Sequence, residues 1–259
     1  MINLNPSPIF LSFGSTKIYW YGFLIFIAFW LGFFIALKRA KKYDLTKDNI
    51  YDLAFWLFAT GLTGARLYHV FSEIIYYQQN PLEILFFWQG GLGIYGAVIA
   101  GILTLFFWSK KKNKSFLSLL DFFIPLIFLG LAIGRWGNFF NQEIYGLPTD
   151  QSWGVFINPE NRLPGYENFS HFHPLFFYES IFCFFLIAFL FLKDKAKKKN
   201  GSIFFSGLLF YSFFRFFIEF LRIDYQPIIF SLRLGQWTSL IFFLSAIFFL
   251  NKKFKNLNK

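Results

Sequence analysis

The sequence has a single cysteine, three histidines and only 14 acidic residues among its 259 positions. Cys183 alone cannot form an intramolecular disulfide, and its place within an apolar run is typical of a small buried hydrophobic side chain. His171 and His173 have no third ligand at a suitable spacing, so we expect no metal site. No serine stands in a nucleophile-elbow motif, so an enzyme built from this chain would take its nucleophile from a substrate.

The chain is instead rich in hydrophobic residues, at 56%, and in aromatic residues, at 25%. A soluble domain is close to half apolar and far less aromatic. Seven apolar runs come close to or reach the roughly 17–25 residues that a transmembrane helix needs. They cover residues 18–37, 50–70, 88–108, 116–133, 176–192, 203–221 and 236–250. We therefore expect an all-α integral membrane protein, with residues 1–259 forming a single polytopic membrane domain.

Eighteen of the 25 basic residues are confined to four segments, 38–47, 110–114, 193–199 and 252–259. These segments connect alternate spans or follow the last one, as the positive-inside rule requires of cytoplasmic connections. The pattern predicts seven transmembrane helices, the N-terminus outside, the C-terminus in the cytoplasm and an extracytoplasmic loop region around 135–175. The net charge of +11 then reflects topology, so we expect no nucleic-acid partner. No basic segment or small-residue cleavage site precedes the first long apolar run, so we expect no removable signal peptide.

Most polar groups within the predicted spans lie at one depth, near the outer surface. They are Tyr21, Arg66, Tyr95, Arg135, Glu179 and Arg215. Polar side chains at membrane depth are expensive and indicate function by default. The three cationic groups are all arginines, whose planar fork binds phosphate or carboxylate at two points. The pattern predicts a site for an anionic lipid headgroup in the outer leaflet.

Arg215, Glu219 and Arg222 are spaced i, i+4 and i+7 in the sixth span, and so share one helix face. One interpretation is a ladder of internal salt bridges. The other is that Glu219 holds Arg215 in one rotamer, with a free edge toward an anionic ligand. In the third span, Gly93, Ala97 and Gly101 have the small-residue spacing of close helix packing, which would carry Tyr95 into a tight crevice.

The stretch 134–146, GRWGNFFNQEIYG, follows the apolar run 116–133 and is the most unusual of the chain. It could anchor lipid headgroups at a helix end, or form a functional site. Its pattern resembles the signature of bacterial prolipoprotein diacylglyceryl transferases. The matching positions are Gly134, Arg135, Gly137, Asn138, Phe139, Asn141, Glu143 and Gly146.

Further blocks resemble that family in the same order along the chain. They are Tyr21-Gly22, Gly90-Gly91 with Tyr95-Gly96, His173-Pro174 with Tyr178-Glu179, and Arg215, Glu219 and Arg222. The resemblance implies transfer of a diacylglyceryl group from phosphatidylglycerol to the lipobox cysteine thiol of a prolipoprotein. A thioether forms and glycerol 1-phosphate leaves, with no metal or cofactor. It also implies a multi-pass protein of the bacterial cytoplasmic (inner) membrane, with its active site toward the outer leaflet.

The resemblance assigns roles to single residues. Arg135 and Arg215 would hold the phosphate and stabilise the charge that develops on it. Glu143 would orient Arg135 or bind glycerol hydroxyls, and Glu219 would orient Arg215. Tyr21 and Asn138 would contact the headgroup, and Asn141, Gly146 and His173 complete the expected substrate-binding set.

One position departs from the family pattern. Tyr95 stands where many members have a histidine, often proposed as the base that activates the thiol. A tyrosine, with an ordinary pKa of about 10, is a poor base at pH 7. The base could be His173, Glu143 or Glu179, or the arginines alone could generate the thiolate. An anionic-lipid transporter and a non-enzymatic assembly factor are the alternatives to an enzyme.

Overall fold

The computed structural model covers the whole chain and describes all of it except residues 1, 3, 5, 15, 196–199 and 256–259. The chain divides into two compact units, Met1–Phe34 with Phe123–Lys259, and Ile35–Phe122. We call them the first and the second unit. The described residues are mostly helical, and three small two-stranded antiparallel sheets accompany the helices.

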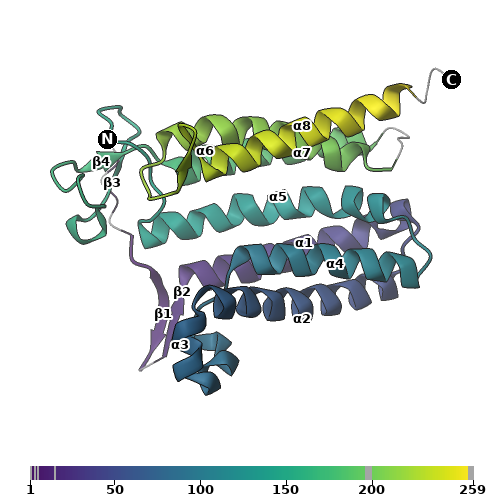
Figure 1. Cartoon of the computed structure of the whole chain (residues 1–259), viewed down its shortest axis with the longest axis horizontal. Helices are drawn as coiled ribbons and strands as arrows, with labels where there is room; N and C mark the ends of the chain where they lie inside the picture. The colour runs from purple at the N-terminus through teal and green to yellow at the C-terminus, as the bar shows by residue number, and fades with distance from the viewer. Residues whose placement is uncertain (1, 3, 5, 15, 196–199, 256–259) are drawn as a thin grey trace. The chain divides into compact units, whose positions relative to one another are not determined.

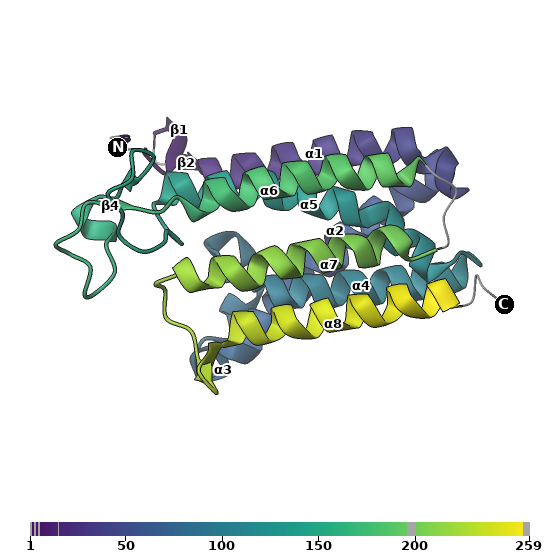
Figure 2. The same ribbon diagram turned by 90° about the horizontal axis from the view of Figure 1, so that it is seen from above.

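Long helices form most of the first unit (Figure 1). It contains most of α1 (Trp20–Arg39) and α5 (Phe116–Asn141), and all of α6 (Leu175–Asp194), α7 (Ser202–Ile218) and α8 (Leu234–Lys255). The helix α7 packs against both α6 and α8, as both views show (Figure 2). Buried side chains of α5, α6 and α7 form a common core. They include Phe128, Ala132, Cys183, Leu190 and Ile203.

Short elements connect these helices. A hairpin of β1 (Ile9–Phe13) and β2 (Thr16–Tyr19) precedes α1. The connection from α5 to α6 contains β3 (Val155–Phe156), the 3-10 turn η4 (Pro159–Asn161) and β4 (His171–Phe172), and has an apolar core of its own. The turn η5 (Glu219–Leu221) follows α7, and β5 (Ile228–Ile229) and β6 (Leu232–Arg233) lead into α8.

The second unit is built on α2 (Lys47–Ser72) and α4 (Ile94–Lys111), which pack against each other. It also contains the 3-10 turns η1 (Ala40–Tyr43), η2 (Pro81–Leu85) and η3 (Phe87–Gln89), and the short helix α3 (Ile74–Gln79). Thr46 caps α2, since its Oγ1 accepts from the amide of Asn49 at 3.2 Å while Asn49 Oδ1 accepts from the Thr46 amide at 3.2 Å.

Close packing of α2 on α4 depends on glycines. A Cβ on Gly96 would lie 2.1 Å from the carbonyl oxygen of Gly64, and a Cβ on Gly93 would lie 2.3 Å from the Tyr68 ring. The expected stripe of Gly93, Ala97 and Gly101 is therefore only partly right. A Cβ on Gly101 would meet its nearest neighbour at 3.9 Å, an ordinary contact. The close contact on α4 is therefore made by Gly93 and Gly96.

Six helices among the described residues are long and apolar enough to cross a membrane. They are Trp20–Tyr43, Ile94–Lys111, Phe116–Asn141, Leu175–Asp194, Ser202–Leu221 and Leu234–Lys252. The remaining predicted span, 50–70, lies within α2, a helix of 26 residues. The chain is thus a mostly helical membrane protein with six such helices and one further long helix of lower hydropathy.

Two predicted boundaries were wrong. The third span was expected from residue 88, but α4 begins at Ile94, because Gly90 and Gly91 have φ angles of 96° and 70° that interrupt a helix. The loop region was expected from residue 135, but α5 continues to Asn141. The helix ends where Gln142 takes a left-handed φ of 51°. Arg135 and Asn138 therefore lie on a helix, three residues apart.

Candidate active site

Arg135 is held by a carboxylate from another helix. Its Nε lies 2.8 Å from Oε2 of Glu179, and its Nη2 donates to Glu179 Oε1 at 2.9 Å. Nη1 donates to Oδ1 of Asn138 at 3.2 Å. The Arg135 side chain is 18% exposed and that of Glu179 is 4% exposed, so the pair is nearly withdrawn from solvent. The two-point contact sets the plane of the guanidinium.

Tyr211 on α7 joins the same cluster, because its hydroxyl donates to Glu179 Oε1 at 2.6 Å. Sequence reasoning did not select this tyrosine. The available signal was its position four residues before Arg215, which places both on one face of α7. The glutamate thus connects a residue of α5 to a residue of α7 across α6.

The carboxylate that pairs with Arg135 is therefore Glu179. The expectation that Glu143 orients Arg135 was wrong. Glu143 Oε1 accepts instead from Nδ2 of Asn138 at 2.8 Å and from Nδ2 of Asn141 at 3.2 Å. These contacts turn the amide of Asn138 so that its oxygen faces Arg135. The chain turns sharply here, since the residues on either side of Glu143 have φ angles of 51° and 54°, a costly conformation for side chains other than glycine.

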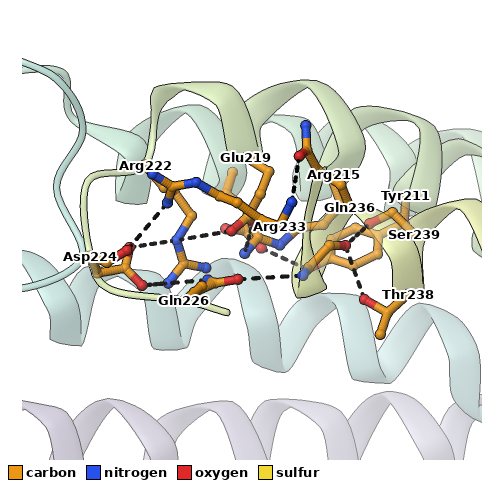
Figure 3. A network of polar contacts seen from close by, with 12 residues as sticks. Tyr211, Arg215, Glu219, Arg222, Asp224, Gln226, Arg233, Gln236, Thr238 and Ser239 are labelled. Carbon is orange, nitrogen blue, oxygen red and sulfur yellow. Dashed lines mark hydrogen bonds and ion pairs between the residues drawn. The ribbon is translucent and has the colours of Figure 1, made fainter. Parts of the chain in front are cut away.

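Glu219 is the centre of a second cluster, shown in Figure 3. Its carboxylate is fully buried, lies 2.7 Å from Nη2 of Arg215, and lies 3.8 Å from Nε of Arg222. The predicted i, i+4 pair is confirmed. Because α7 ends at Ile218 and Arg222 has an extended backbone, the three residues do not continue one helical face as expected.

Arg222 is bound by a further acid. Its Nε and Nη2 donate to the two oxygens of Asp224 at 2.7 and 2.6 Å. Burial alone would raise the pKa of Asp224, but the hydrogen bonds and the charge of Arg222 outweigh burial and hold that pKa below its ordinary value. Asp224 is therefore ionised at neutral pH and fixes Arg222 beside Glu219.

The start of α8 closes this cluster. A Cβ on Gly235 would lie 2.9 Å from a carboxylate oxygen of Glu219, so the backbone approaches Glu219 more closely than a side chain allows. The side chain of Gln236 is buried, and its Oε1 accepts from the amide of Arg233 at 3.0 Å. Gln226 Oε1 accepts from the Gly235 amide at 3.3 Å. The loop after α7 is thus tied to α8.

Gly146 contacts His173 and lies next to the second cluster, since it forms a β-bridge with Arg222. The Gly146 amide donates to the His173 carbonyl at 2.9 Å, and a Cβ on Gly146 would lie 3.0 Å from the Cβ of His173 and from the carbonyl oxygen of Leu221. His173 Nδ1 lies 2.9 Å from the hydroxyl of Tyr178, and burial lowers the pKa of His173. The imidazole is therefore largely neutral at pH 7.

Tyr21 lies at the start of α1 with its ring against α5. A Cβ on Gly137 would lie 2.2 Å from Cδ2 of that ring, so the signature glycine provides the space that the ring occupies. The neighbouring Trp20 stacks on Phe140 with centroids 4.4 Å apart. The first unit thus places Tyr21 beside the signature helix that also carries Arg135.

The second unit holds two residues singled out from the sequence. Arg66 is 8% exposed and donates to the carbonyls of Ile84 at 2.9 Å, Gly90 at 2.7 Å, Gly91 at 3.1 Å and Glu83. Its interpretation as a phosphate-binding arginine was wrong, because the guanidinium organises the loop before α4.

Tyr95 was expected in a tight crevice, and that was also wrong. Its side chain is 60% exposed on α4, with its ring 5.7 Å from that of Tyr68. Gly93 and Gly96 lie in the close α2–α4 contact, and Tyr95, the residue before Gly96, points away from that contact.

Of the ten residues expected in the catalytic and substrate-binding sets, the first unit contains all except Tyr95. Among them, Arg135 with Asn138, Glu143 with Asn141, Arg215 with Glu219, and Gly146 with His173 are in contact. Among the described residues, no group of three His, Cys, Asp or Glu side chains is placed to hold a metal ion. The arrangement offers largely buried arginines, each oriented by a buried carboxylate, and can stabilise a dianionic group.

Comparison with known proteins covers nearly the whole chain. A family model described as prolipoprotein diacylglyceryl transferase matches residues 8–251. A phosphatidylglycerol–prolipoprotein diacylglyceryl transferase of Halalkalibacterium halodurans is 38% identical over 244 residues, which cover 92% of this chain and 83% of that protein. Proteins with the same name from Acaryochloris marina and Finegoldia magna are 41% identical over 241 residues and 39% identical over 235 residues. These matches cover 92% and 90% of this chain, and 87% and 90% of the respective relatives.

Proposed function

The chain belongs to the prolipoprotein diacylglyceryl transferase family, and we propose on that basis that it carries out the first step of lipoprotein maturation. It is a transferase that acts on phosphatidylglycerol and a prolipoprotein. The acceptor is the thiol of the lipobox cysteine. The whole-length similarity to enzymes of this name disfavours the transporter and assembly-factor alternatives.

The reaction requires one bond to form and one to break. The cysteine sulfur attacks the glyceryl carbon that carries the phosphate, and the carbon–oxygen bond breaks with its electron pair leaving on glycerol 1-phosphate. The thiol proton passes to a base of the protein. The negative charge of the phosphate grows in the transition state, so donors that are already in place there lower the barrier.

Arg135 and Arg215 bind this phosphate in our proposal. The observation that carries the assignment is that each is paired with a buried glutamate, Glu179 at 2.8 Å and Glu219 at 2.7 Å. The contacts of the described residues engage only Nη2 of Arg215, so its other donors remain for a ligand. Tyr211 supports the assignment, because it links the Arg135 cluster to the helix of Arg215.

The other candidate residues complete the lipid site. Asn138 donates one amide hydrogen to Glu143, and its second hydrogen binds the headgroup in our proposal. Glu143 and Asn141, which contact each other, bind the glycerol hydroxyls. Tyr21 borders the headgroup from α1. Gly146 allows close approach of the segment that carries His173.

The candidates for the base differ in their surroundings. Glu179 already accepts from Arg135 and Tyr211. His173 Nδ1 lies 2.9 Å from the Tyr178 hydroxyl, and burial lowers the pKa of His173, so the ring is neutral; with the proton on Nδ1, donated to Tyr178, its Nε2 accepts a proton. These features support His173 over Tyr95. A pH–rate profile tests the choice, since His173→Gln should abolish the acid limb and Tyr95→Phe should leave it in place.

We propose a seven-span topology in which α2 is the seventh spanning helix, with the N-terminus outside and the C-terminus in the cytoplasm. The protein then lies in the bacterial inner membrane with the site toward the outer leaflet. The lysine-rich segments at the ends of α1 and α4 support this orientation. Single cysteines introduced in a Cys183→Ser background should react with an impermeant thiol reagent at residue 151 and resist it at residue 112.

The decisive assay is transfer in detergent. Purified protein is incubated with phosphatidylglycerol and a synthetic lipobox peptide, and the thioether product is followed by mass. Arg135→Gln should form no product while retaining a cooperative thermal transition. Arg135→Lys keeps the charge but not the two-point contact with Glu179, and should retain only residual activity. A well-folded parent protein that forms no product with several lipobox peptides would contradict the proposal.

A further inference from the structure

The second unit contains a groove between α2 and α4 that none of the proposed site residues lines. It comprises two adjoining cavities of about 430 and 350 Å³ that share Trp56, Thr60 and Ala100. The larger cavity extends along α4 from Ala100 to Lys111. Both are lined by residues of the second unit alone.

The lining of the groove suits hydrocarbon. Its rims are large apolar side chains that remain exposed, with Trp56 at 47%, Leu103 at 49% and Phe107 at 65%. The two hydroxyls inside it, of Thr60 and Thr104, lie 2.7 Å apart. Each is also within hydrogen-bond distance of the carbonyl four residues earlier in its own helix. The polar groups are therefore satisfied without water.

The length of the groove matches one leaflet of a bilayer. Eleven residues separate Ala100 from Lys111, which at 1.5 Å per residue is about 16 Å. Half of the roughly 30 Å hydrocarbon core is about 15 Å. An acyl chain that starts at the level of Lys111 would therefore end near Ala100, where α2 and α4 come together at Gly64 and Gly96.

Lys111 differs from the three lysines around it. Lys110 lies over the ring of Phe106 at 5.7 Å, Lys112 lies 4.0 Å from Asp52, and Lys114 donates to the carbonyl of residue 44 at 2.6 Å. Lys111 alone among them lines the cavity, and no described contact pairs it with an acid. A positive charge thus stands at the open end of an apolar groove.

We propose that this groove binds one anionic phospholipid, with an acyl chain between α2 and α4 and the phosphate at Lys111. The site lies at the end of α4 that carries the lysines, opposite in depth to the Gly93 end of the helix. It holds a lipid that supports the packing of the second unit and does not react. A neutral phospholipid lacks the net negative charge that Lys111 selects.

The test counts bound lipid and measures its effect on stability. Parent protein, Lys111→Gln and the matched control Lys110→Gln are prepared with phosphatidylglycerol or with phosphatidylcholine of the same chains. Native mass spectrometry gives the number of retained lipids, and thermal melts give the stabilisation. Lys111→Gln should retain one phosphatidylglycerol fewer and lose about fivefold in preference over phosphatidylcholine, the effect of one lysine at an anionic surface. Lys110→Gln should behave as the parent.

A second variant tests the apolar part. Leu103→Trp fills the groove from its exposed rim and should remove the same lipid, while transfer activity at excess phosphatidylglycerol stays at the parental level. If Lys110→Gln and Lys111→Gln lose the same amount of bound phosphatidylglycerol, the lipid responds only to diffuse surface charge and the proposal is overturned. Equal retention of both lipids would also overturn it. Efficient disulfide crosslinking of Leu103→Cys between two copies, in a Cys183→Ser background, would show a protein partner in the groove instead.

Discussion

Replacing Gly137 by alanine should displace Tyr21. Comparison with Gly134 then distinguishes a signature glycine that makes room for a neighbouring ring from one that does not. The new Cβ would lie 2.2, 2.8 and 3.0 Å from three atoms of the Tyr21 ring. Carbon atoms in contact are about 3.5–4.0 Å apart. The ring must therefore move by at least about 1.3 Å, or the helices must separate.

Gly134 is the matched control, because it lies one turn earlier in the same helix and a Cβ there would meet nothing within 4 Å. Gly134→Ala should be neutral or slightly stabilising, by up to about 1 kcal/mol, since alanine favours a helix over glycine. Gly137→Ala should lose about 1–3 kcal/mol through overpacking. A misplacement of about 1 Å in a reacting complex costs about 100-fold in rate, and we expect a loss of that size.

The assay is thioether formation from phosphatidylglycerol and a lipobox peptide, with a thermal melt of each variant. Adding Tyr21→Ser to Gly137→Ala removes the ring that clashes. The double variant should recover its melting temperature but not its activity, because the headgroup contact is then absent. Activity of Gly137→Ala within threefold of Gly134→Ala, at equal stability, would refute the reasoning.

Three further changes test other parts of the structure. Glu179→Gln leaves the guanidinium of Arg135 buried without its counter-charge and should lower the free energy of unfolding by about 3–5 kcal/mol, measured by denaturant titration. A change below about 1 kcal/mol would show that solvent screens this ion pair. The pKa of Asp224 is held below its ordinary value in the folded protein. The stability contributed by its pair with Arg222 is therefore present above about pH 4 and is lost as pH falls through the lower folded pKa. The melting temperature of Asp224→Asn should accordingly change less with pH across that window than that of the parent. Arg66→Lys cannot reach all the carbonyls that Arg66 binds and should speed amide hydrogen exchange in the loop before α4, with transfer by the folded protein reduced less than by loss of Arg135.

The sequence was sufficient for the class of protein and for its family. A bilayer needs long continuous apolar segments, and these can be recognised one segment at a time. The signature stretch around Arg135 and the pair of Arg215 with Glu219 are also local patterns, and the structure confirms that pair at 2.7 Å. Even the exception among the spans, α2, is a helix where a helix was predicted.

The partners of the buried arginines were decided only by the tertiary structure. Glu179 lies 44 residues from Arg135, and Tyr211 lies on a third helix, so no local spacing connects them. Arg66 looked like the other two arginines in sequence, yet it binds a loop whose carbonyls converge because two glycines adopt positive φ angles. Composition and spacing report what each helix contains. Which side chains meet depends on how the helices rotate and approach, and that is set by packing between residues far apart in the chain.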